Sequence, residues 1–388
     1  MTMNPPAADP TSAEVRPFRI SIPQAALDDL NERLDRTRWP DPVSGANWKY
    51  GVSLEHAKEL AAHWRRSYRW REHEARLNEL PQFATTIDGA NVHFFHVRSP
   101  EPEAMPLLLT HGWPATNLEF LKLIEPLTNP RAYGGDPEDA FHLVIPSIPG
   151  FGFSGPTREA GWNTERVAKA WDTLMKRLGY ASYGAHGGDA GSLVTRAMGV
   201  QRPEGLLGIH VLQLFSFPSG DPAEMADLSE DDKKRLQALA NFTERAGFSA
   251  IQQTRPLTLA YGLSDSPAGQ LAWNAELFNG FGDTVDAVDR DDFLTNVTLY
   301  WLTNTAESTA RWYYEDAHGS GAASREPNRT PTGVAVFPHD FQSMRRFAQR
   351  DNPAIVHWSE FERGGHFAAM DAPDLLAQDL RTFFRRFR

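Results

Sequence analysis

The sequence contains no cysteine among its 388 residues. Disulfide bonds, a thiolate nucleophile and a cysteine-bound metal are therefore all excluded. A chain without cysteine fits the reducing interior of a cell, and we expect a cytoplasmic location. Any chemistry carried out by this protein has to come from other side chains.

Basic residues are also in short supply. The chain has 39 Lys and Arg against 50 Asp and Glu, which gives a net charge of −11. This balance argues against a nucleic-acid partner, because such partners select for clustered positive charge. No stretch of about 18 apolar residues occurs, and the N-terminal segment Met1 to Arg16 is polar and rich in proline. We therefore expect a soluble protein without a membrane anchor.

What the sequence does contain is a series of short apolar runs separated by segments with helical spacing. The runs lie at residues 107–110, 141–146, 207–212 and 333–337, and a helical segment lies at 164–178. Buried strands that alternate with helices are typical of an α/β fold with a mostly parallel sheet. A chain of 388 residues is long enough for a large core that carries an insertion.

One long segment interrupts this alternation. From residue 218 to 324 the sequence has helical spacing almost throughout, and it ends in small residues from Gly319 to Ser324. We interpret it as a helical insertion between two parts of the sheet domain. The expected division of the chain is a disordered tail (1–15), a helical N-terminal extension (16–80), a first core part (81–217), the insertion (218–324) and a second core part (325–388).

The extension is expected to begin with a capped helix. Ser21 stands where a capping residue is usual, and Pro23 would lie in the first turn. A second helix is predicted from about Leu54, because Ala57, Leu60, Ala61 and Trp64 repeat at helical spacing.

The most informative segment is Gly187-Gly188-Asp189-Ala190-Gly191. Two small residues that flank a central residue in this way are typical of a sharp strand-to-helix turn, which usually presents a nucleophilic serine. Here the central residue is Asp189, and a carboxylate can attack an sp³ carbon to form an alkyl ester. An aspartate that only caps a helix after a glycine-rich turn explains this segment alone equally well.

Two candidate partners follow in the order nucleophile, acid, histidine that hydrolases with such a turn use. Asp340 comes just after the apolar run 333–337, and His366 lies in a glycine-containing loop after the strand predicted at 354–358. A carboxylate beside the imidazole would orient the ring as a base. Each residue alone is more often a turn or surface residue, but the three in this order indicate a catalytic set.

The loop His111-Gly112-Trp113-Pro114 follows the apolar run 107–110. A loop in this place can aim a backbone N–H at the nucleophile, and we expect the N–H groups of Trp113 and Ala190 to form an oxyanion hole. The alternative is an ordinary glycine–proline turn. Gly150 to Gly155 matches a dinucleotide-binding pattern, but Pro156 follows where a helix should begin, so we discount it.

Aromatic residues gather on predicted helices of the insertion, at Tyr300-Trp301 and at Trp312-Tyr313. Such residues are usually core. A tyrosine hydroxyl is nevertheless a neutral acid at pH 7, because its pKa is near 10. Tyr313 above the turn could therefore donate a hydrogen bond to an oxygen that gains charge as its bond to carbon breaks.

Together these motifs resemble those of the microsomal-type epoxide hydrolases, over about residues 15–388. The resemblance includes the motifs around Trp113 and Asp189 already described. The further motifs that carry it are Gly364-Gly365-His366-Phe367-Ala368-Ala369, Thr254-Arg255-Pro256-Leu257-Thr258, Asp265-Ser266-Pro267 and Tyr300-Trp301-Leu302-Thr303. It implies an α/β-hydrolase fold in which the insertion forms a helical cap and the N-terminal extension wraps the core and the cap.

The resemblance also implies roles for single residues. Asp189 would be the nucleophile, His366 the base and Asp340 the acid that orients it. Two cap tyrosines hold the epoxide oxygen in this family; Tyr313 matches one of them, whereas the other position is Phe248 in this chain.

The missing hydroxyl at Phe248 leaves three alternatives open. Tyr313 acts alone, another group such as Tyr261 replaces the second tyrosine, or the substrate carries its own donor. We expect a substrate pocket lined by Phe248, Tyr261, Trp273, His111 and Pro114. Its aromatic character favours an apolar and bulky epoxide.

The expected reaction opens an epoxide to a vicinal diol through an ester on Asp189, with water as the second reactant and no metal or organic cofactor. A haloalkane or haloacid dehalogenase is the alternative, because it uses the same three residues with N–H donors for the halide. A ligand receptor with a hydrolase fold is the third interpretation, although an intact catalytic set weighs against it. Similar bacterial enzymes serve natural-product pathways, such as those of enediynes, or detoxification. The sequence leaves a homodimer open.

Overall fold

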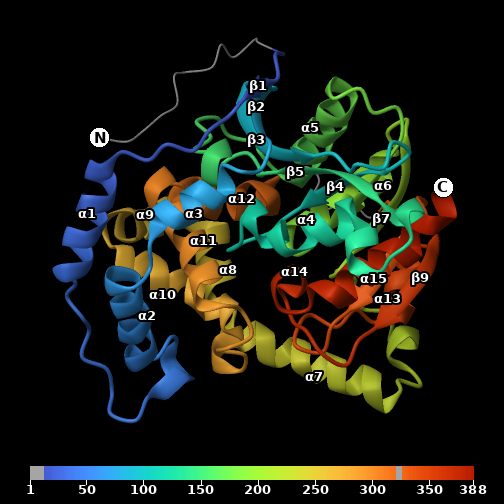
Figure 1. The fold of residues 1–388 in the computed structure, drawn as a ribbon. Helices are drawn as coiled ribbons and strands as arrows, with labels where there is room; N and C mark the ends of the chain where they lie inside the picture. Colours follow the sequence, from blue (N-terminus) through green and yellow to red (C-terminus); the bar gives the residue numbers. More distant parts are fainter. Residues whose placement is uncertain (1–12, 320–325) are drawn as a thin grey trace.

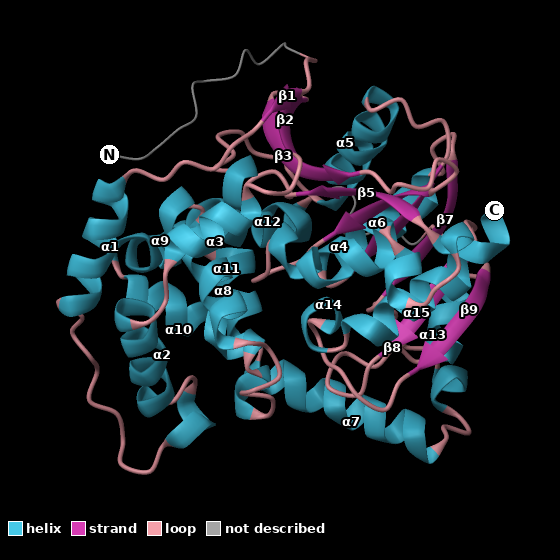
Figure 2. Cartoon of the chain, in the orientation of Figure 1, coloured by secondary structure: helices cyan, strands magenta, loops and turns pink. Residues whose placement is uncertain are grey.

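The computed structural model describes residues 13–319 and 326–388. Most of the tail predicted at 1–15, and the end of the predicted insertion at 320–324, lie outside the described residues. The chain folds around a central sheet with helices on both faces, and a second group of helices lies beside it (Figure 1). Figure 2 shows that this second group contains helices and loops, whereas the strands are confined to the sheet.

The described residues form one sheet of nine strands. The strands are β1 (Arg16–Pro17), β2 (Gln82–Ile87), β3 (Ala90–Val97), β4 (Met105–Thr110), β5 (Phe141–Pro146), β6 (Tyr183–Gly187), β7 (Leu206–Val211), β8 (Thr332–Val336) and β9 (Ile355–Glu360). Their order is β1-β2-β3-β5-β4-β6-β7-β8-β9. The pairs from β1 to β5 are antiparallel, and all pairs from β5 to β9 are parallel. The carboxyl ends of the parallel strands therefore meet at one edge, where ligands bind in open α/β sheets.

The predicted strands are confirmed, with boundaries that differ by one or two residues. β4, β5, β7 and β8 coincide with the four apolar runs in the sequence. Leu107, Leu108 and Leu109 of β4 are all fully buried, although successive side chains point to opposite faces. Both faces of the central sheet are thus covered, so these strands are continuous apolar runs and do not alternate between apolar and polar residues.

The helices that cover the two faces are α4 (Leu121–Thr128), α5 (Thr164–Arg177), α6 (Ala190–Gln201) and α15 (Pro373–Phe384). A Cβ atom at Gly184 of β6 would clash with Phe384 of α15, and one at Gly187 would clash with Thr195 of α6. Positions 184 and 187 point to opposite faces of the strand, so α15 and α6 cover opposite faces. α4 packs on α15, and α5 packs on α6.

The N-terminal extension contains α1 (Gln24–Asp35), α2 (Leu54–Arg66) and α3 (Trp70–Leu77). α2 is confirmed, but the predicted cap at Ser21 is wrong: α1 begins at Gln24, with Pro23 at its N-cap and no side chain capping it. The preceding segment is bound elsewhere, because the N–H of Ile22 donates to the Glu74 carboxylate of α3 at 2.7 Å. Long-range contacts therefore decide where this helix starts.

The insertion between β7 and β8 is helical in its described part, as predicted. Its helices are α7 (Glu230–Arg245), α8 (Gly247–Thr254), α9 (Pro256–Asp265), α10 (Pro267–Phe278), α11 (Arg290–Thr303) and α12 (Ala306–His318). The extension is bonded to it: the indole N–H of Trp64 donates to the Thr298 hydroxyl at 2.8 Å, and Tyr68 donates to Thr295 at 3.1 Å. Both acceptors lie on α11.

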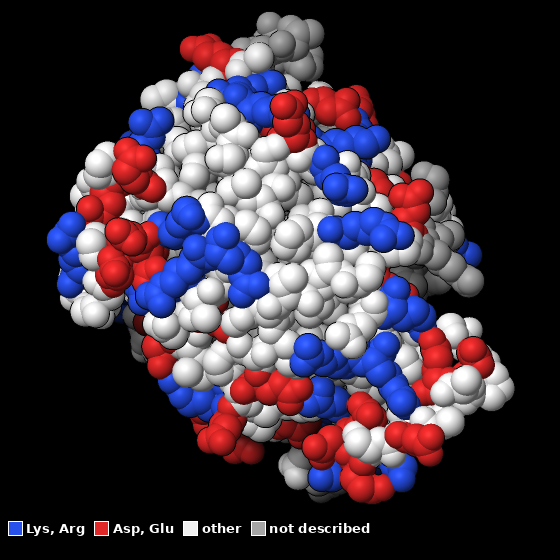
Figure 3. Space-filling model, turned by 90° about the vertical axis from the view of Figure 1, so that its right-hand side faces the viewer, with Lys and Arg blue, Asp and Glu red and all other residues white. Residues whose placement is uncertain are grey.

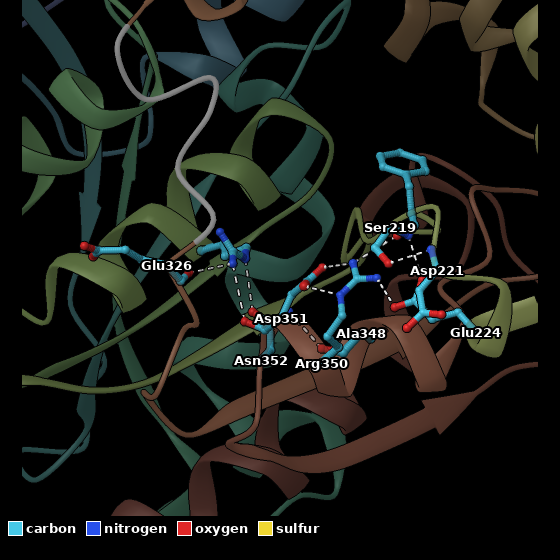
Figure 4. Close-up of polar contacts among 10 residues, drawn as sticks. Ser219, Asp221, Glu224, Glu326, Ala348, Arg350, Asp351 and Asn352 are labelled. Carbon is cyan, nitrogen blue, oxygen red and sulfur yellow. Dashed lines mark hydrogen bonds and ion pairs between the residues drawn. The ribbon is translucent and has the colours of Figure 1, made fainter.

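The segment that leads from β7 into the insertion is held against α13 (Arg345–Asp351). Figure 4 shows the Arg350 side chain between this segment and Asp351. Its guanidinium donates to the Glu224 carboxylate at 2.6 Å and to the Phe217 carbonyl at 2.9 Å. These contacts fix the path of the chain as it leaves the sheet.

Acidic and basic side chains are interspersed on the face of the molecule that Figure 3 shows. No helix within residues 13–319 and 326–388 combines the length and the apolar character needed to cross a lipid bilayer.

Candidate active site

Asp189 occupies a sharp turn between β6 and α6, as predicted from the glycines around it. Its backbone has φ 51° and ψ −120°, a conformation that residues with a side chain rarely adopt. A Cβ atom at Gly187 would lie 2.1 Å from the Gly191 carbonyl oxygen, and one at Gly191 would lie 1.9 Å from the Thr110 carbonyl oxygen. Only glycine fits at either position, so the two glycines allow the turn to pack tightly against β4.

The Asp189 carboxylate lies against two backbone donors. The N–H of Trp113 donates to Asp189 Oδ1 at 2.9 Å, and the N–H of Ala190 also bonds to the carboxylate. Burial raises the pKa of Asp189, whereas the charge of His366 and these two N–H groups oppose that rise. The side chain keeps 21% of its surface exposed, so a small molecule can reach it.

His366 links Asp189 to Asp340. Its Nδ1 lies 2.7 Å from Asp340 Oδ1, and its Nε2 lies 3.6 Å from Asp189 Oδ2. Burial lowers the pKa of His366, but the carboxylates of Asp340 and Asp189 outweigh that effect and raise the pKa to about 9. The structure therefore brings together the three residues that the sequence had singled out.

Gln213 also belongs to this cluster, and the sequence analysis missed it. It follows β7 and is 1% exposed. Its side-chain oxygen accepts the backbone N–H of Asp189 at 2.5 Å, and its NH₂ group donates to Asp340 Oδ2. Its position just past a predicted strand, like those of Asp189 and Asp340, was the available signal.

Glu119 is a second residue that the sequence analysis missed. It lies in the short helix η2 (Asn117–Phe120) and is 8% exposed. Burial raises its pKa well above the ordinary range. The charge of His366 lowers this pKa and the charge of Asp189 raises it further. The sequence offers no signal for it, since a glutamate in a helical turn is usually solvated.

The rings of Phe248 and Tyr313 meet at Trp113. Phe248 stacks on Trp113 with ring centroids 5.1 Å apart, and Tyr313 meets the same indole edge-on at 5.7 Å. Burial raises the pKa of Tyr313 well above the ordinary range, and the charge of Asp189 adds to this effect. Among the described residues the Tyr313 hydroxyl has no hydrogen-bond partner, and Tyr313 is not one of the residues that line the cavity described next.

A cavity of about 350 Å³ opens beside Asp189, Asp340 and His366. Residues from both the sheet domain and the insertion line it, and phenylalanine is the most common among them. The lining phenylalanines are Phe215, Phe217, Phe242, Phe248, Phe278, Phe281, Phe341 and Phe367.

Of the five predicted pocket residues, only Phe248 lines this cavity. Tyr261 is 73% exposed, because the buried face of α9 carries Ala260 and Leu263 and so turns Tyr261 outward. It therefore cannot replace the missing second hydroxyl.

His111 is fully buried, with Nδ1 bonded to the Gly112 carbonyl oxygen and Nε2 to the N–H of Ile148. Burial lowers its pKa to about 4, so this ring is a neutral part of the core. Pro114 is also buried and outside the cavity lining, and its carbonyl oxygen accepts from the side chain of Asn296. Trp273 is outside the lining too, because its ring packs on Trp113 and its N–H bonds to Gln252.

The sheet order and the Asp189 turn define an α/β-hydrolase. A family model for the α/β-hydrolase fold matches residues 105–373, and one for the epoxide hydrolase N terminus matches residues 15–120. A protein of Stigmatella aurantiaca named "Putative epoxide hydrolase" is 46% identical over 96% of this chain and 86% of its own length. "Epoxide hydrolase 1" of Sus scrofa is 33% identical over 97% of this chain and 91% of its own length.

The fold also matches a crystal structure, that of juvenile hormone epoxide hydrolase from the silkworm Bombyx mori. The TM-score is 0.90 with 29% identity, and the match covers 100% of this chain and 98% of the silkworm chain. The chain belongs to the epoxide hydrolase family, as the motifs in its sequence predicted, and it is an enzyme of the hydrolase class.

Proposed function

We propose that this enzyme opens an apolar epoxide to a vicinal diol through an alkyl ester on Asp189. The observation that carries the proposal is the position of the Asp189 carboxylate, which lies between two backbone N–H groups and the His366–Asp340 pair. A carboxylate so placed can act as a nucleophile, and the ester that it forms can be hydrolysed in the same site. No metal or organic cofactor takes part in the proposed steps.

In the first step, Asp189 Oδ2 attacks one epoxide carbon, because Oδ1 already accepts the N–H of Trp113. A bond forms between Oδ2 and that carbon, and the bond from carbon to the ring oxygen breaks. The ring oxygen gains negative charge, which the Tyr313 hydroxyl stabilises by donating a hydrogen bond, and it then takes the proton that His366 carries in the free enzyme. The raised pKa of Tyr313 keeps its proton in place for this role at neutral pH.

In the second step, His366 Nε2 takes a proton from water, and the resulting hydroxide attacks the Asp189 carboxyl carbon. The oxyanion develops on Oδ1, where the N–H groups of Trp113 and Ala190 hold it. The bond between the Asp189 carboxyl carbon and Oδ2 then breaks, and the departing alkoxide takes the proton from His366. The proton left on the new Asp189 carboxyl group passes to His366, which restores the starting enzyme. The Asp340 carboxylate, bonded to Nδ1 of His366, stabilises the imidazolium.

Ester formation also prepares the base. In the free enzyme, the Asp189 charge is one of the effects that raise the pKa of His366 to about 9. The ester is uncharged, so this effect disappears when the first step is complete. The pKa of His366 falls, which favours the neutral imidazole at the stage when it has to accept a proton from water.

The cavity supports an apolar substrate. Its phenylalanine lining offers apolar contacts next to the nucleophile, and the insertion supplies several of those rings. We therefore propose that the insertion, residues 218–324, acts as the cap and that residues 81–217 and 325–388 form the hydrolase core. An epoxide with an aromatic or long aliphatic body fits this environment, as in styrene oxide.

The source of the diol oxygen tests the ester mechanism. A single turnover of styrene oxide in ¹⁸O-water should give unlabelled diol, because the new oxygen comes from Asp189 Oδ2. The His366→Gln protein should accumulate the ester, seen as a mass adduct on the peptide that contains Asp189. Labelled diol from the first turnover, or no adduct on that peptide, would contradict the mechanism.

No observation favours the dehalogenase alternative, since the N-terminal family match and the three relatives above are all epoxide hydrolases by name. Chloride release from chloroalkanes, measured beside diol formation, separates the two reactions. Halide release without diol formation would reverse the assignment.

A further inference from the structure

The Gln213 side chain touches both the nucleophile and the acid. Its oxygen accepts the backbone N–H of Asp189 at 2.5 Å, and its NH₂ group donates to Asp340 Oδ2. It accepts a further bond, at 3.2 Å, from the Ser192 hydroxyl in the first turn of α6. The amide therefore spans the space between the turn that carries the nucleophile and the loop that carries the acid.

The direction of this amide is fixed by its surroundings. The Asp189 backbone offers only a donor, so the side-chain oxygen of Gln213 has to face it. A flipped amide would set NH₂ against N–H and leave both donors without an acceptor in a buried place. The NH₂ group is consequently forced toward Asp340.

The forced direction also orients the Asp340 carboxylate. Its Oδ2 faces the NH₂ group of Gln213, and its Oδ1 faces Nδ1–H of His366. Each oxygen therefore accepts from one donor, and turning the carboxylate away from His366 would break both hydrogen bonds.

We propose that Gln213 is a positioning residue that directs Oδ1 of Asp340 at His366 and so keeps the imidazole oriented. The backbone N–H of Asp189 decides which way the Gln213 amide faces. Hydrogen bonds through this amide therefore connect the Asp189 turn to Asp340. This role rests on the proposed function, because it acts on the base that hydrolyses the ester.

The bond between residues 213 and 340 can be reversed by exchanging their side chains, so that position 213 carries the carboxylate and position 340 the amide. In Asp340→Asn alone, the new amide oxygen has to accept from His366, so its NH₂ group meets the NH₂ group of Gln213. In Asp340→Asn with Gln213→Glu, the new carboxylate accepts both the Asp189 N–H and the NH₂ group at position 340. Every donor again has an acceptor, and positions 213 and 340 together still carry one negative charge.

The test measures ester formation and ester hydrolysis separately, by mass spectrometry of the full-length protein after rapid mixing with styrene oxide. Asp340→Asn should slow hydrolysis by about 10²–10⁴-fold, the range for loss of a working general base. The exchange variant should recover about tenfold of that loss, which is what one restored buried hydrogen bond is worth. Each double variant is compared with Asp340→Asn, and circular dichroism checks that every variant is folded.

The matched control is Asp340→Asn with Gln213→Met. It removes the clash between the two NH₂ groups but supplies no carboxylate, and it should hydrolyse the ester no faster than Asp340→Asn. The positioning role is overturned if the exchange variant shows no recovery, or if the methionine control recovers equally. If His366→Gln traps no ester at all, the proposed function fails too. If His366→Gln traps the ester but the exchange variant does not recover hydrolysis, only the role of Gln213 is rejected.

Discussion

Tyr313 is the one predicted cap tyrosine that lies at the candidate site, where the resemblance to the microsomal-type epoxide hydrolases implies two. The second position is Phe248, whose ring stacks on Trp113 and meets Tyr313 edge-on at 6.3 Å. Tyr261 points away from the cavity, so it does not compensate. The remaining alternatives are that Tyr313 acts alone or that the substrate carries a donor of its own.

If Tyr313 is the donor to the epoxide oxygen, Tyr313→Phe should slow ester formation by about 10²–10³-fold, as loss of one donor to a developing oxyanion does. Ester hydrolysis should change little, because the ring oxygen has already become a hydroxyl. Pre-steady-state mixing with styrene oxide measures both rates.

The neighbouring Tyr314→Phe is the matched control. Tyr314 is 37% exposed and stacks on His318, so loss of its hydroxyl should leave both rates unchanged. Equal slowing in the two variants, or none in either, would show that Tyr313 is not the donor. A gain in ester formation for Phe248→Tyr would show that a second hydroxyl is useful to this enzyme.

At the scale of elements, α7 forms one wall of the cavity. Arg235, Ala238, Leu239, Phe242 and Arg245 all line it, and their spacing places them on one side of the helix. Arg235 pairs with Glu360 at 2.7 Å and Arg245 with Asp283 at 2.9 Å, near the two ends of the helix. None of the α7 residues is buried, so one side of the helix lines the cavity and the other side faces solvent.

A large side chain on that side should therefore narrow the substrate range. Ala238→Trp is expected to lower kcat/KM for a bulky aryl epoxide by at least about tenfold, because the indole would occupy cavity space that this substrate needs. A small epoxide such as propylene oxide should lose much less. The ratio of kcat/KM values for the two substrates is the measurement.

Ala240→Trp places the same side chain on α7 outside the cavity lining, and it should leave that ratio unchanged. An altered ratio for Ala240→Trp, or an unaltered one for Ala238→Trp, would show that α7 does not limit the substrate as its position indicates.

In the whole molecule, the N-terminal extension joins the sheet to the insertion. β1 pairs with β2 at one edge of the sheet, and α2 bonds to α11 of the insertion through Trp64 and Thr298. Arg33 of α1 adds an ion pair with Asp265 at 2.9 Å, but this pair is exposed and contributes little. The buried bond between Trp64 and Thr298 is the stronger tie.

Thr298→Val keeps the shape of the side chain but removes the acceptor for the Trp64 indole N–H. We expect the free energy of unfolding to fall by about 1–3 kcal/mol, the cost of a buried donor left unpaired. Urea unfolding followed by tryptophan fluorescence measures the change. Thr298→Ser keeps the hydroxyl and should lose less; if it loses as much as the valine variant, packing rather than this bond accounts for the stability.

Local sequence patterns carried a large part of this structure. The turn at Asp189 is encoded within five residues, because only glycine fits at positions 187 and 191. The strands were visible as apolar runs since both faces of the sheet are covered. Asp340 and His366 could be proposed from their order and their positions just past strands.

Other features depended on contacts that no local pattern records. The start of α1 follows from a bond between Ile22 and Glu74, not from Ser21. Tyr261 was a candidate to replace the second tyrosine, but the packing of α9 turns it to solvent. Gln213 lies 127 residues from its partner Asp340, and a glutamine after a strand is unremarkable in sequence.

The sequence by itself determined the strands that appear as apolar runs, the sharp turn at Asp189 and the choice of Asp189, Asp340 and His366 as candidates, because sterics and burial act over a few neighbouring positions. Only the tertiary structure decided which rings enclose the cavity and which amide contacts Asp340. Those choices rest on hydrogen bonds and packing between segments far apart in the chain, and they exist only after the chain has folded.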